Sequence, residues 1–191
     1  MSLELCKIDV CLREVNLSDK PIEMLHISPK GTVPILVLPD ETVIDESLAI
    51  MIWSLKRFSH VNKQTHKWLD KSIYEPSIKL VQQNDIDFKP LLDKYKYCTE
   101  QGAVVHHREN AEWFLSLLND SLEQCFYLLG DELTLADIAT FPFIRQFALV
   151  DYDWFLNSRY KALVRWLRYL LTLDCFNRVM LKQVVFRSAI G

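Results

Sequence analysis

The pattern of apolar and polar positions in the first third of the chain is typical of short strands followed by a helix. Residues 11–16 alternate between apolar and polar, and residues 33–38 form a short apolar run. The turn-forming residues 39–41 separate this run from residues 42–44, so the pattern predicts a strand at 11–16 and then a hairpin. A helix is predicted from residue 45 to about residue 58. Its apolar positions recur at helical spacing: Leu48, Met51, Ile52 and Leu55.

The rest of the chain has the pattern of a helical protein. Segments 103–126 and 160–171 each carry one apolar face. In the first segment this face consists of Ala111, Phe114, Leu115, Leu118 and Leu122, and in the second of Leu163, Trp166, Leu167, Leu170 and Leu171. Gly130 stands where a helix C-cap is expected.

Residues 134–149 predict a helix that is buried on every side. Thr134 is a good N-cap, and Asp137 is the acid of a short capping box. Leu133 and Ile138 suit a hydrophobic staple across the same helix start. Because the body of this helix is apolar almost all round, it is expected to be the centre of the helical part.

A polar stretch at residues 59–64 separates the two patterns. It predicts a domain boundary, with an N-terminal domain at residues 1–59 and an all-helical domain at residues 60–191. The expected fold class is therefore α/β followed by all-α.

Composition excludes several kinds of function. The net charge of −3 gives no overall positive field for nucleic acid. Four scattered glycines cannot form a glycine-rich phosphate loop, which excludes dinucleotide-binding and P-loop proteins. Five widely spaced cysteines predict neither a metal site nor a disulfide framework, and reduced thiols fit a cytoplasmic protein. No apolar run reaches the length of about 18 residues that a membrane span needs.

Three blocks of residues resemble the glutathione transferase family, in its bacterial type. Residues 28–36, Ser-Pro-Lys-Gly-Thr-Val-Pro-Ile-Leu, and residues 44–50, Ile-Asp-Glu-Ser-Leu-Ala-Ile, are similar to its thioredoxin-like domain. Residues 129–139, Leu-Gly-Asp-Glu-Leu-Thr-Leu-Ala-Asp-Ile-Ala, are similar to its helical domain. The resemblance implies a thioredoxin-like domain followed by a glutathione-transferase-type helical domain, and a homodimer.

The resemblance also implies a glutathione-binding site at Val33, Pro34, Glu46 and Ser47. Val33 would bind the cysteinyl unit through its backbone, and the Val33–Pro34 bond would be cis. A helix N-terminus and the Ser47 hydroxyl suit the γ-glutamyl carboxylate, and Glu46 can accept from the ammonium. Taken alone, the tripeptide Asp45-Glu46-Ser47 fits ordinary helix capping better. With Val33–Pro34 about a dozen residues earlier, we favour the binding site.

The family's first strand, and the residue that activates the glutathione thiol, have no counterpart here. Residues 2–8 resemble the end of the family's first helix, so the resemblance predicts a chain that is N-terminally short by roughly 20 residues. The catalytic residue is expected upstream of Met1. Cys6 is a poor substitute, because no proline follows it and no helix N-terminus is there to lower its pKa.

Three functions remain open at this point. The first is an enzyme that conjugates glutathione to a small electrophile, or that transfers thiols through a mixed disulfide. The second is a non-catalytic binding protein that has lost its N-terminal nucleophile. The third is a fragment that folds only as a strand-sharing dimer. Glutathione is the expected substrate, without a metal, and a pure scaffold has no need to keep the Val33–Pro34 and Glu46–Ser47 pairs.

Overall fold

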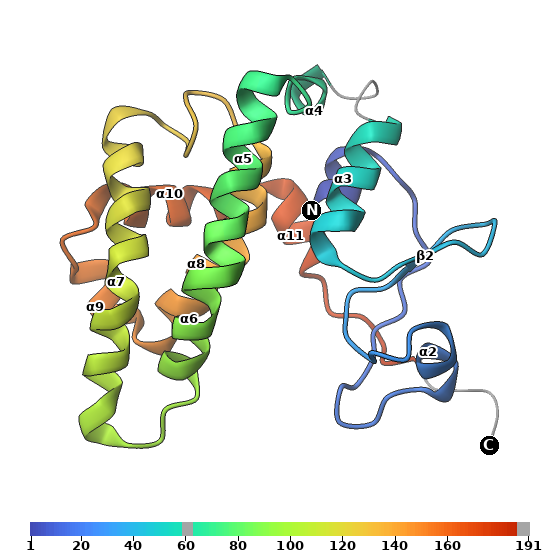
Figure 1. Cartoon of the computed structure of the whole chain (residues 1–191), viewed down its shortest axis with the longest axis horizontal. Helices are drawn as coiled ribbons and strands as arrows, with labels where there is room; N and C mark the ends of the chain where they lie inside the picture. Colours follow the sequence, from blue (N-terminus) through green and yellow to red (C-terminus); the bar gives the residue numbers. More distant parts are fainter. Residues whose placement is uncertain (59–62, 187–191) are drawn as a thin grey trace.

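The protein consists of a small N-terminal unit beside a larger helical unit (Figure 1). A computed structural model describes residues 1–58 and 63–186. The predicted domain boundary between residues 59 and 60 lies outside the described residues, so it stays a prediction. No helix in the described ranges is long and apolar enough to cross a membrane.

The N-terminal unit is built on a short antiparallel hairpin. Its elements are α1 (Ser2–Leu5), α2 (Ile22–Ile27), β1 (Leu36–Val37), β2 (Val43–Ile44) and α3 (Ser47–Phe58). In the hairpin, Leu36 lies opposite Ile44 and Val37 opposite Val43. The predicted hairpin is thus confirmed, with strands shorter than the apolar runs that indicated them.

Helix α3 turns a different face inward from the one its apolar spacing indicated. Of its four predicted core positions only Leu55 is fully buried, and the others are half-buried. Ile50 and Ser54 complete the buried face. The hydroxyl of Ser54 is satisfied locally, because it donates to the Met51 carbonyl at 2.8 Å.

The strand predicted at residues 11–16 does not form. Glu14 makes one parallel bridge with Val185, and its carbonyl accepts from the Phe186 N–H at 2.7 Å. A strand forms where a neighbouring segment pairs with it over several consecutive residues. In the described part of the chain, this segment is bridged only by Asp19 in the turn that follows it and by the short tail after α11, which Figure 1 shows crossing from the helical unit. The alternation is present, but a continuing ladder is not.

The helical unit surrounds one central helix. Its elements are α4 (Lys63–Lys67), α5 (Lys71–Gln83), the π-helical turn η2 (Asn84–Phe88), α6 (Lys89–Lys96), α7 (Gln101–Gln124), α8 (Leu135–Val150), α9 (Tyr152–Asn157), α10 (Lys161–Leu170) and α11 (Asp174–Val179). Helix α8 is buried on nearly all sides, as predicted. The predicted apolar faces of α7 and α10 are also buried, apart from the half-buried Leu171.

Asp137 caps the start of α8 and ties it to two other parts of the helical unit. One carboxylate oxygen accepts from the backbone N–H and hydroxyl of Thr134, at 2.9 and 2.7 Å. The other accepts from the Leu128 N–H at 2.9 Å and from the Trp166 indole at 2.8 Å. Burial raises the pKa of this carboxyl, and the four donors oppose that shift. The predicted capping box is confirmed. Its Asp137 also accepts hydrogen bonds from residues outside α8.

Gly130 is not the helix C-cap that its position suggested. Helix α7 ends at Gln124, and Cys125 is its C-cap residue. Gly130 instead closes a tight turn, in which the Tyr127 N–H donates to the Gly130 carbonyl at 2.8 Å. Its φ of +137° is disfavoured for residues with a side chain, so a glycine is needed in this turn.

We expect Asp137→Ala to destabilise the protein by about 3 kcal/mol or more, because several buried donors lose their acceptor at once. Urea unfolding followed by circular dichroism measures this change. The matched control is Asp120→Ala on the exposed side of α7, which should change stability by less than about 0.5 kcal/mol. Equal effects of the two substitutions would contradict the role given to Asp137.

Candidate functional site

A tight turn and a cis proline precede β1. The Gly31 N–H donates to the Ser28 carbonyl at 2.9 Å, and Gly31 has a φ of +59°. A Cβ on Gly31 would lie 3.0 Å from Leu25 Cδ2, so the turn requires a glycine there. The Val33–Pro34 bond is cis, as predicted, and Val33 is 48 % exposed. The chain therefore presents Val33 at the surface just before it enters the hairpin.

Helix α3 begins directly after β2 with free backbone donors. Its first helical hydrogen bond runs from the Ile50 N–H to the Glu46 carbonyl at 2.9 Å. The N–H groups of residues 47–49 consequently have no acceptor within the helix. The side chains of Glu46 and Ser47 are exposed beside these donors. Together these groups can bind a carboxylate and an ammonium that lie close to each other.

The hairpin connects the two segments that carry the four predicted site residues. Leu36 lies opposite Ile44, and the Leu38 N–H donates to the Thr42 carbonyl at 2.9 Å. The ladder ends at the Leu36–Ile44 pair. Pro34 and Glu46 each lie two residues beyond that pair, and Val33 and Ser47 one residue further, at the same end of the hairpin. The predicted site residues, about a dozen positions apart in the sequence, thus flank the same end of the hairpin.

Lys30 is a member of this site that the sequence interpretation missed. Its ammonium lies 3.2 Å from Asp45 Oδ2 and 3.3 Å from Glu46 Oε1. These two carboxylates, Asp45 first, raise the pKa of Lys30, so the side chain is charged at neutral pH. Lys30 lies in the block 28–36 that resembles the family, but no pattern in the sequence predicts its ion pairs with residues 45 and 46.

The thiol of Cys6 is unsuited to catalysis. It is fully buried, and burial raises its pKa, which disfavours the reactive thiolate. All five cysteines of the chain are free. Within the described ranges, no cluster of His, Cys, Asp or Glu could hold a metal ion.

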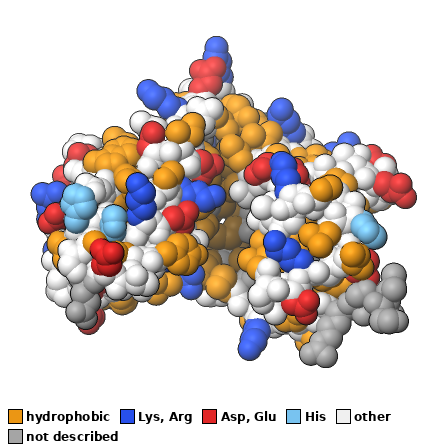
Figure 2. All heavy atoms as spheres, turned by 60° about the horizontal axis from the view of Figure 1, so that its bottom comes forward, with side chains coloured by type: hydrophobic (Ala, Val, Ile, Leu, Met, Phe, Trp, Pro, Cys, Tyr) orange, Lys and Arg blue, Asp and Glu red, His pale blue; other side chains and the backbone are white. Residues whose placement is uncertain are grey.

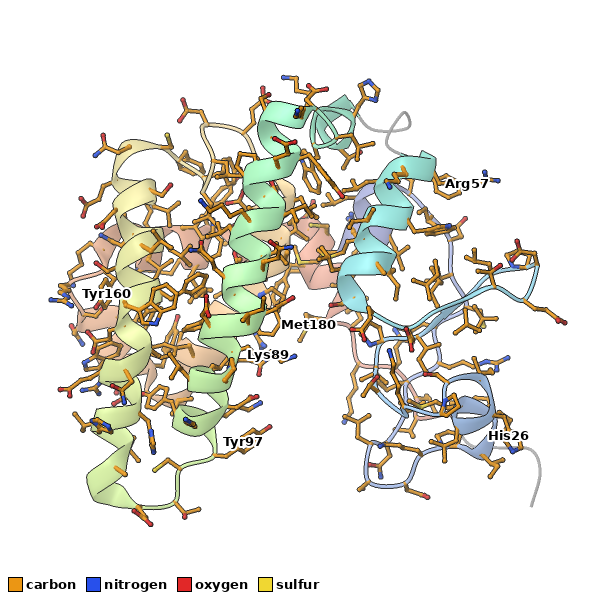
Figure 3. The ribbon with its side chains drawn as sticks, viewed as in Figure 1. His26, Arg57, Lys89, Tyr97, Tyr160 and Met180 are labelled. Carbon is orange, nitrogen blue, oxygen red and sulfur yellow. The ribbon has the colours of Figure 1, made fainter. Side chains whose placement is uncertain are left out.

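A hollow lies between the two units, and apolar side chains gather around it (Figure 2). Figure 3 shows Lys89 and Tyr97 extending from α6 and its C-terminal end towards the N-terminal unit, and Met180 lying in the space between the units. The Lys89 ammonium lies 5.7 Å from the centre of the Phe143 ring. Tyr97 and Met180 are largely exposed, at 69 and 52 %. These three residues lie on the side of the helical unit that faces the N-terminal unit, and the Lys96 ammonium lies 4.9 Å from the centre of the Tyr97 ring.

Comparisons with known proteins match each of the two units to a domain of one protein family. The family description "Glutathione S-transferase, N-terminal domain" matches residues 1–56, and "Glutathione S-transferase, C-terminal domain" matches residues 103–168. The chain belongs to the glutathione transferase family. Its fold is accordingly a thioredoxin-like unit followed by the family's helical domain.

The relatives come from several kinds of organism. Glutathione S-transferase F10 of Arabidopsis thaliana is 28 % identical over 134 residues, which are 63 % of this chain and only 60 % of that relative. The structure of glutathione transferase F2 from Populus trichocarpa has a TM-score of 0.79 at 18 % identity, covering 93 % of this chain and 88 % of that one. The structure of BphK, a bacterial transferase, has a TM-score of 0.77 at 19 % identity, covering 93 and 88 %. The bacterial type that the sequence suggested is not singled out by these matches.

Gly31→Ala should destabilise the protein by about 1–2 kcal/mol, since the new Cβ meets Leu25 in a left-handed backbone conformation. Gly102→Ala is the matched control: it lies in α7, and nothing within 4 Å would meet its Cβ. This control should leave stability unchanged or raise it by up to about 1 kcal/mol. Urea unfolding of both variants measures the difference, and a harmless Gly31→Ala would contradict the geometry given for the turn.

Proposed function

We propose that this chain binds glutathione at Val33, Pro34, Glu46 and Ser47 and acts as a glutathione transferase. The observation that carries the proposal is the hairpin, which has the cis Val33–Pro34 segment and the start of α3 at the same end. In the proposed reaction, the glutathione thiol attacks a small electrophile or takes part in thiol transfer.

Each part of glutathione has a complementary group on this surface. The γ-glutamyl carboxylate accepts from the N–H groups of residues 47–49 and from the Ser47 hydroxyl. The γ-glutamyl ammonium donates to the Glu46 carboxylate. The cysteinyl unit pairs with the exposed backbone of Val33, as an extended peptide pairs with a strand edge. Its thiol then lies beside the hollow between the two units.

Solved relatives support glutathione as the ligand. Transferase URE2P6 from Phanerochaete chrysosporium was solved in complex with oxidized glutathione, and it is 17 % identical with a TM-score of 0.78. A family member from Pseudomonas fluorescens was solved with two glutathione molecules bound, at 20 % identity and a TM-score of 0.73.

The electrophile in this proposal binds in the hollow, against the apolar surface of Tyr97 and Met180. We also propose a homodimer in the cytoplasm. Trp113 and Leu117, on the outer side of α7, are 41 and 40 % exposed and border a surface hollow of about 880 Å³, which suits a partner subunit.

Catalysis requires a group that favours the glutathione thiolate, because a free thiol has a pKa of about 8.5. We assign no such group within the chain, since the thiol of Cys6 is itself buried with a raised pKa. The same site would serve a non-catalytic glutathione-binding protein. Binding without turnover of an aryl halide would favour this second function.

The experiment that tests the proposal is calorimetric titration with reduced glutathione. The double variant Glu46→Ala, Ser47→Ala should weaken binding by at least about 30-fold, because charge-assisted hydrogen bonds to both head-group charges are lost. The matched control is Ser72→Ala, Glu75→Ala, which removes the same side chains from the exposed start of α5. Glutathione affinity that is equal in the two variants would refute the site.

A further inference from the structure

The ammonium of Lys30 already occupies the acidic corner of the proposed glutathione site. The tight turn closed by Ser28 and Gly31 presents the lysine towards the start of α3. Its Nζ atom lies between Asp45 Oδ2 and Glu46 Oε1, at 3.2 and 3.3 Å. Glu46 is the acceptor assigned above to the γ-glutamyl ammonium. The Lys30 ammonium therefore occupies the position at Glu46 that the ammonium of glutathione would take.

We propose that Lys30 is a specificity-determining residue that competes with the amino group of glutathione for Glu46. This inference rests on the proposed function and adds a residue to the same site. A ligand with an ammonium must move Lys30 away from Glu46, or bind beside a like charge. A ligand that lacks the ammonium leaves the Lys30 pairs in place.

The geometry makes this competition mild and reversible. The side chains of Lys30 and Glu46 are more than half exposed, at 58 and 67 %, so water can replace either partner. Asp45, whose side chain is 31 % exposed, can retain its ion pair with Lys30 when Glu46 binds the ammonium of the ligand. Each exposed ion pair of this kind contributes little free energy. Its loss or gain therefore changes the affinity by about two- to five-fold.

The competition also changes which ligands the site prefers. Glutaryl-cysteinyl-glycine is glutathione without its amino group, and it keeps both carboxylates. Lys30 attracts those carboxylates in both ligands but opposes the ammonium in glutathione alone. The ratio of the two dissociation constants therefore isolates the competition from the general attraction of a lysine for an anion.

The test is to titrate both ligands into the full chain and into three variants by calorimetry. Lys30→Met should raise the preference for glutathione over its des-amino analogue by about two- to five-fold. Lys30→Arg retains the cation and should keep the preference of the unmodified chain. Lys56→Met is the control for net charge, because Lys56 is an exposed residue in the last turn of α3, far along the helix from Glu46.

The outcomes separate the inference from the function on which it rests. An unchanged or reduced preference in Lys30→Met, with glutathione still bound, overturns the competition and leaves the glutathione site standing. Weaker binding of both ligands by the same factor assigns Lys30 to a ligand carboxylate and also overturns it. If no variant and not even the unmodified chain binds glutathione, the proposed function fails, and the role of Lys30 fails with it.

Discussion

The pairing of β1 with β2 is the constraint on which the candidate site depends. The ladder is short, with Leu36 opposite Ile44 and Val37 opposite Val43. A shift of the register by one residue would turn the side chains of the shifted strand to the other face of the hairpin. The cis proline directs the chain into one end of this hairpin, and α3 leaves from the same end. The candidate binding groups of both segments therefore flank the same end of the hairpin.

The helical unit contributes a rigid wall to this arrangement. Asp137 joins the start of α8 to the turn before it and to Trp166 of α10. Aromatic rings fill the centre around α8, with Tyr95 and Phe147 at 4.8 Å and Phe88 and Phe114 at 4.7 Å between ring centres. Because α6 belongs to this packed core, Lys89 and Tyr97 reach the hollow from a fixed support (Figure 3). The proposed glutathione site lies on the small unit, and the large unit lies across the hollow from it (Figure 2).

Local patterns predicted the parts of the fold that local forces determine. The buried faces of α7 and α10, the mostly apolar α8 and the capping box at Thr134 follow from periodicity and from the chemistry of helix ends. The hairpin followed from two apolar runs around a turn. The four candidate site residues came from the family resemblance, and the hairpin explains why the two pairs lie at the same end of the ladder.

What the sequence could not show depends on contacts between distant residues. The alternation at residues 11–16 is real, but a strand also needs a partner, and a single bridge to Val185 does not supply one. Gly130 has a positive φ in a tight turn. A glycine after a helical pattern does not reveal whether it ends the helix or closes such a turn. The contact of Lys30 with Glu46 joins residues 16 positions apart through the folded hairpin, so no local motif indicates it.

The central claim is that Val33 and the first turn of α3 form one binding surface. Amide chemical shifts of the ¹⁵N-labelled chain, followed during titration with reduced glutathione, test this claim most directly. The account predicts that the Val33, Ser47 and Leu48 amides shift together along one binding curve, while the Gly130 amide in the distant turn stays unchanged. Saturation with glutathione that leaves Val33 and Ser47 unmoved, or that shifts them along different curves, would contradict it.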